Sequence, residues 1–70
     1  MTPLHPVLSE REETVLLLIG DGLGLREIAC RMGTTPRAIR RLRDGAREKL
    51  KASTTAQAVA VVIRLQVAQG

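Results

Sequence analysis

The sequence has no phenylalanine, tyrosine or tryptophan among its 70 residues. Single-stranded nucleic acid is usually bound by stacking its bases on aromatic rings, so this absence disfavours a single-strand binder and an RNA-recognition sheet. The single cysteine, Cys30, excludes an internal disulfide and a paired-cysteine metal site. The single histidine, His5, is far from Cys30 in the sequence, so neither a metal ion nor another cofactor is expected.

Long hydrophobic runs and catalytic motifs are also missing. No apolar run reaches the ~18 residues of a membrane span, and the first residues lack the basic start and apolar block of a signal peptide. The glycine-containing turn at residues 22–24 fits neither dinucleotide-binding nor Walker spacing. No catalytic triad is recognisable. We therefore expect a cytoplasmic protein that is neither an enzyme nor a membrane protein.

Positive charge, in contrast, is abundant. The net charge is +4 and the sequence pI is about 10.7, which favours a polyanionic partner such as nucleic acid or an anionic membrane surface. The chain is long enough for one small domain with a marginal, purely aliphatic core. Because disulfides and metal ions are excluded, dimerisation is the most accessible additional source of stability.

The most informative stretch is residues 36–51, which the pattern predicts to be a helix. Thr35 can cap its first turn, and Pro36 suits the first helical position. Apolar residues recur three or four apart along one face, at Ile39, Leu42, Ala46 and Leu50. The opposite face is rich in arginine, and a helix of this kind fits a DNA major groove, which is about 12 Å wide. A solvated charged face is the plainer interpretation of the same run.

Two shorter helices are predicted before it, at residues 9–20 and 25–32. Ser9 and Glu12 have the spacing of a capping box at the first start, and Gly33 ends the second helix. Two helices joined by a tight glycine-containing turn, the second of them basic, are typical of a helix-turn-helix. The two prolines within residues 1–7 predict a flexible tail or linker, which leaves residues 8–70 as the folded domain.

A last helix is predicted at residues 55–68, with a second capping box formed by Thr54 and Gln57. This segment is apolar around most of its circumference, so it should be covered on more than one side. The domain's own core covers one side, and an identical helix of a second subunit is the simplest cover for the other. The expected dimer contacts are Val61, Ile63, Arg64 and Val67. The fold class is therefore all-α, with four helices.

Five segments in order resemble the LuxR-type, or GerE-like, helix-turn-helix domain. These segments are Leu8-Ser9-x-Arg11-Glu12-x-x-Val15-Leu16-x-Leu18, Gly22-Leu23-x-x-Arg26-Glu27-Ile28-Ala29, Gly33-x-Thr35-x-x-Ala38-Ile39-Arg40, Lys49-Leu50 and Thr54-x-x-Gln57-Ala58-Val59. Each segment is weak evidence alone, but their order and spacing are specific. The resemblance implies a four-helix bacterial transcription factor domain that binds double-stranded DNA at the nucleoid and often dimerises through its fourth helix.

The resemblance also implies roles for individual residues. Arg40, Arg41 and Asp44 occupy the positions that face DNA bases. The positions that approach phosphates hold Arg26, Thr35, Arg37 and Lys49. Arginine can donate two hydrogen bonds to guanine, and a carboxylate can accept one from cytosine, so the chemistry agrees.

The sequence departs from the family pattern at several positions, and other interpretations follow from this. Gly45 lies inside the recognition helix at a cost of about 1 kcal/mol relative to alanine, and Ala46 replaces a larger apolar residue.

Residues 46–50 also resemble the end of region 4 of bacterial sigma factors, which would make RNA polymerase a partner. A third alternative is a helical protein-interaction module that has lost DNA binding.

Overall fold

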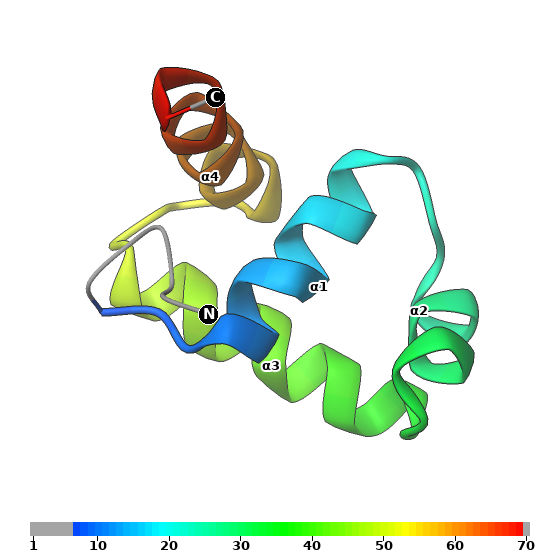
Figure 1. Cartoon of the computed structure of the whole chain (residues 1–70). Coiled ribbons are helices and arrows are strands. Elements are labelled where there is room, and N and C mark those ends of the chain that lie inside the picture. Colours follow the sequence, from blue (N-terminus) through cyan, green and yellow to red (C-terminus); the bar gives the residue numbers. More distant parts are fainter. Residues whose placement is uncertain (1–6, 70) are drawn as a thin grey trace.

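The computed structural model describes residues 7–69, and within this range it consists of four α-helices without a strand (Figure 1). The helices are α1 (Glu10–Gly20), α2 (Leu25–Met32), α3 (Pro36–Lys49) and α4 (Thr55–Gln69). The predicted all-α, four-helix class is confirmed. Helix α3, the predicted recognition helix, ends at Lys49 rather than at residue 51. Most of the predicted tail, residues 1–6 with His5, lies outside the described residues.

The helix starts are fixed by side chains close to them in the sequence. In the capping box of α1, Ser9 Oγ accepts a hydrogen bond from the Glu12 N–H (3.1 Å) and Glu12 Oε1 accepts one from the Ser9 N–H (2.9 Å). At α3, Thr35 Oγ1 accepts from the Ala38 N–H (3.2 Å). Both caps confirm the predictions.

The predicted capping box of α4 forms only in part. Thr54 Oγ1 accepts from the Gln57 N–H at 3.1 Å, as expected. The Gln57 side chain, however, accepts from the N–H of Ser53 (2.8 Å) instead of that of Thr54. The amide therefore satisfies a donor one residue before the cap and holds the α3–α4 connection against the start of α4.

Three helix ends use a residue in the left-handed conformation. The φ angles are 91° at Gly22, 67° at Gly33 and 54° at Lys51. In each case the next residue donates a hydrogen bond back into the last turn, as in a Schellman motif. These bonds run from Leu23 to Leu18 (3.2 Å), from Thr34 to Ala29 (2.9 Å) and from Ala52 to Arg47 (3.0 Å). Gly22 and Gly33 have no side chain, whereas Lys51 adopts this conformation although it disfavours a residue with a side chain.

The interior consists of two clusters of buried side chains on either side of α1. The α4-side cluster lies between α1, α3 and α4 and contains Leu8, Leu16, Ala46, Ala58, Val59 and Val62. The α2-side cluster lies between α1, α2 and α3 and contains Val15, Ile28, Ala29 and Ile39. Within residues 7–69, α2 and α4 make no contact with each other and lie at opposite ends of the molecule (Figure 1). Consequently α1 and α3 form the frame on which both outer helices pack.

Gly20 permits the close approach of α1 and α4. A Cβ atom at this position would lie 3.0 Å from Val59 Cγ1 and 3.2 Å from Ile63 Cδ1. Nine in ten real Cβ contacts are longer than this, so a side chain at position 20 would require the side chains of Val59 and Ile63 to shift.

Candidate nucleic-acid interface

The outer face of α3 is a row of exposed arginines. Arg37, Arg40 and Arg41 follow an i, i+3, i+4 spacing and are all exposed. On the opposite face Ile39 and Ala46 are completely buried, which fixes the rotation of the helix. The predicted division of α3 into an aliphatic back and a cationic front is therefore present in the structure.

The start of α3 forms a shallow depression that is open to solvent. It is lined by Thr35, Arg37, Ala38 and Arg41. The unpaired N–H groups and positive dipole end of a helix N-terminus favour anions at such a place. The structure thus brings two predicted phosphate contacts, Thr35 and Arg37, beside one predicted base contact, Arg41.

Four predicted DNA contacts have guanidinium groups that are free to meet an anion. Arg26 on α2 is exposed like the three arginines of α3. Within residues 7–69 none of these four forms an ion pair, in contrast to Arg31, whose Nη2 lies 3.9 Å from Glu27 Oε2. An unpaired guanidinium needs no internal bond to be broken before it binds a phosphate or a base.

The predicted base contact Asp44 is held by its neighbour in the chain. Arg43 Nε donates to Asp44 Oδ1 at 3.0 Å, and the two side chains are 27% and 45% exposed. The pairing could not be read from the sequence, because adjacent residues of a helix usually point in different directions. The free lone pairs of Asp44 can still accept a hydrogen bond from a base.

Lys49, predicted to approach phosphates, lies at the other end of α3 and binds Glu12. Lys49 Nζ donates to Glu12 Oε1 at 2.8 Å, and the Glu12 side chain is only 7% exposed. Burial alone raises the pKa of Glu12, but the hydrogen bonds from Lys49 and Ser9 and the charge of Lys49 outweigh it and hold that pKa below its ordinary value. Sequence reasoning placed Glu12 only in the capping box and missed this contact between α1 and α3.

Gly45 lies directly under the Glu12 carboxylate. A Cβ atom at Gly45 would be 3.2 Å from Glu12 Oε2. Gly45 has a low helix propensity, but it leaves room next to α3 for a buried carboxylate of α1.

Comparison with known proteins agrees with this geometry. The family model GerE, described as bacterial regulatory proteins of the luxR family, matches residues 6–62. The chain belongs to this family. It is accordingly a DNA-binding transcription regulator with a helix-turn-helix formed by α2 and α3. No match was found among curated proteins or among solved structures.

The luxR-family match favours the first of the two resemblances over the sigma-like one. The residues of α4 that fall within it include Ala58, Val59 and Val62, which complete the α4-side cluster.

The outward residues of α4 divide into two groups. Ile63 and Val67 are exposed, at 39% and 73%, and form an apolar stripe on one side. Val61 and Arg64, the other predicted dimer contacts, border a groove beside the α3–α4 connection. Ile63 and Val67 are thus the exposed large hydrophobic residues of α4.

Among residues 7–69 no three His, Cys, Asp or Glu side chains are grouped in a way that could hold a metal ion. No helix in that range has the length and apolar character needed to cross a membrane.

Proposed function

We propose that this luxR-family domain regulates transcription by reading specific double-stranded DNA sequences with α3 in the major groove. The observation that carries the proposal is the exposed, unpaired arginine face of α3 above a fully buried Ile39. A rigidly seated helix can hold its guanidinium groups at fixed positions, which sequence reading requires. The domain would act at the nucleoid in the cytoplasm.

The proposed contacts separate into two classes. Arg40 and Arg41 donate to the O6 and N7 atoms of guanine, and Asp44 accepts from the N4 amino group of cytosine. Arg26, Thr35 and Arg37 contact phosphates and set the position of the helix without reading the sequence. Lys49 contributes positive charge near the backbone while its ammonium group remains bound to Glu12.

We further propose a homodimer formed around Ile63 and Val67, with Val61 and Arg64 at its margin. Two exposed aliphatic side chains on one stripe of α4 favour burial against a second copy. A two-fold dimer would place its recognition helices on half-sites about one helical turn, 34–36 Å, apart.

The test is selection of bound duplexes from a random DNA library, followed by titrations of the enriched sequence at several salt concentrations. Arg40→Ala and Arg41→Ala should each cost about 1–3 kcal/mol and relax the preference at the base pair contacted. Arg37→Ala should weaken all sequences equally and reduce the salt dependence.

Arg11→Ala is the matched control, since Arg11 is an exposed arginine of α1 outside the helix-turn-helix. If no sequence is enriched, or if the Arg40 and Arg41 variants retain the parent's preference, the base-reading assignment is wrong.

A further inference from the structure

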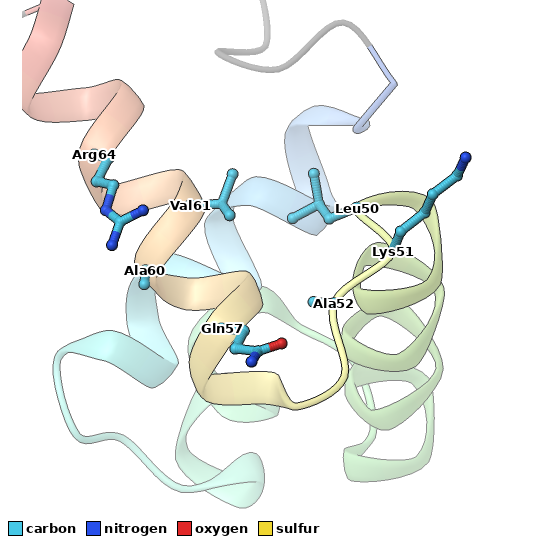
Figure 2. A pocket seen from close by; sticks show the side chains of 7 residues that line it. All are labelled: Leu50, Lys51, Ala52, Gln57, Ala60, Val61 and Arg64. Carbon is cyan, nitrogen blue, oxygen red and sulfur yellow. The ribbon is translucent and has the colours of Figure 1, made fainter.

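A groove lies at the corner where the α3–α4 connection meets α4, away from the arginine face of α3. It has a volume of about 370 Å³. It is lined by Leu50, Lys51, Ala52, Gln57, Ala60, Val61 and Arg64 (Figure 2). None of these residues is a proposed base or phosphate contact, and two of them, Val61 and Arg64, lie at the margin of the proposed dimer.

The floor of the groove is apolar. Leu50 and Ala52 contribute from the α3–α4 connection, and Ala60 and Val61 contribute from α4. All four are partly exposed rather than buried. Aliphatic surface left accessible in a concave site gains free energy when an aliphatic side chain of a ligand covers it.

The rim of the groove is cationic. Arg64 lies on the α4 side and Lys51 on the opposite side, on the connection, where its long side chain extends away from α4 (Figure 2). Both are exposed, and within residues 7–69 neither forms a hydrogen bond or an ion pair through its side chain. The sequence contains no aspartate or glutamate after Glu48, so no acidic residue of these two segments can neutralise them.

From this combination we infer that the groove binds an acidic amphipathic segment of a partner protein, with aliphatic side chains on the floor and carboxylates beside Lys51 and Arg64. Charge complementarity favours such a partner over duplex DNA and over a second copy of this chain. DNA has phosphates for the rim but no aliphatic side chain for the floor. A second copy packed across a two-fold axis through the groove itself, rather than through Ile63 and Val67, would bring Lys51 and Arg64 against the same cations.

The probe is a synthetic helical peptide with leucines on one face and glutamates on the other, titrated into the full chain and followed by backbone amide NMR. We expect saturable shifts at Leu50, Ala52 and Val61. Matched peptides with alanine for each leucine, or with lysine for each glutamate, should leave these signals unchanged.

Charge reversal provides the second arm. Lys51→Glu combined with Arg64→Glu should weaken the acidic peptide by about tenfold or more, while the matched reversal Arg11→Glu with Arg31→Glu should not. The groove double variant should instead bind the lysine-leucine peptide. The dispersion of the amide signals establishes whether each variant is folded. If the charge-reversal variant is unfolded, the neutral variant Lys51→Gln with Arg64→Gln replaces it.

Several outcomes would overturn the inference. They are a peptide without effect on the groove signals, an alanine peptide that binds equally well, and equal weakening by the control reversal. Groove signals that move with a duplex DNA would assign the site to nucleic acid. Leu50 and Ala52 are not among the proposed dimer contacts. If their signals move with the protein's own concentration, the groove is assigned to a second copy.

Discussion

Lys49 Nζ and Glu12 Oε1 are 2.8 Å apart and join the last residue of α3 to the first turn of α1, 37 residues apart in the sequence. The same carboxylate closes the capping box of α1 through the Ser9 N–H. One buried side chain thus satisfies the N-terminus of α1 and fastens α3 to α1.

Glu12→Gln should make the stability of the domain less sensitive to acid. Because the pKa of Glu12 is lowered in the folded state, its contribution is present above the ordinary value of 4.5 and is lost as the pH falls through the folded pKa. We expect the variant to be about 1–2 kcal/mol less stable at pH 7, with the difference shrinking towards acid pH. Urea denaturation at pH values from about 2.5 to 7, in steps of about 0.5, measures the unfolding free energy of the parent and the variant across this range.

Glu10→Gln is the control for that series, since Glu10 lies in the same turn but is exposed. It should change the unfolding free energy by no more than about 0.5 kcal/mol. A difference between parent and Glu12→Gln that stays constant with pH would contradict the assigned role of the carboxylate.

Gly45→Ala should reveal the contact between Gly45 and Glu12. Alanine gains about 1 kcal/mol of helix propensity, but in the parent its Cβ would lie 3.2 Å from a carboxylate oxygen that is tied down through its other oxygen. The full gain is therefore expected only in a Glu12→Ala background. A double-mutant cycle by chemical denaturation measures the coupling, and equal gains in both backgrounds would show that the carboxylate does not constrain position 45.

Lys51→Gly should stabilise the domain. The left-handed conformation at φ 54° costs a residue with a side chain about 1 kcal/mol, and glycine removes this cost. Part of the gain is lost because glycine gives the unfolded chain more conformational freedom. We expect a net gain of about 0.5 kcal/mol, or roughly 2–4 °C in Tm. Gly33→Ala, at φ 67°, is the inverse experiment and should lower Tm; a lowered Tm for Lys51→Gly would mean that its side chain stabilises the helix end.

Ile63→Ser combined with Val67→Ser should convert the proposed dimer into monomers. The exposed aliphatic stripe loses the apolar surface that a second copy would bury. Sedimentation equilibrium should show the mass falling to that of one chain, and affinity for a two-half-site duplex should fall while single half-site affinity is kept. Gln66→Ala, at an exposed position of the same helix, should leave the mass unchanged. A parent that is monomeric at every concentration would refute the dimer.

The features that could be predicted are those encoded within a few neighbouring residues. The caps at Ser9 and Thr35 and the end of α2 at Gly33 each depend on one turn of chain, and the exposed arginine face follows from helical spacing. The burial of Glu12, its bond to Lys49 and the reason for Gly45 depend on where α1 lies against α3. Such contacts join residues that no local pattern relates, so they appear only in the folded arrangement.

Ile19 is the partly buried side chain that packs against both the α4-side and the α2-side clusters. Because α2 and α4 do not touch, a substitution on the outer side of α4 can change its surface without contacting α2. A change at Ile19, in contrast, alters the packing of both clusters at once.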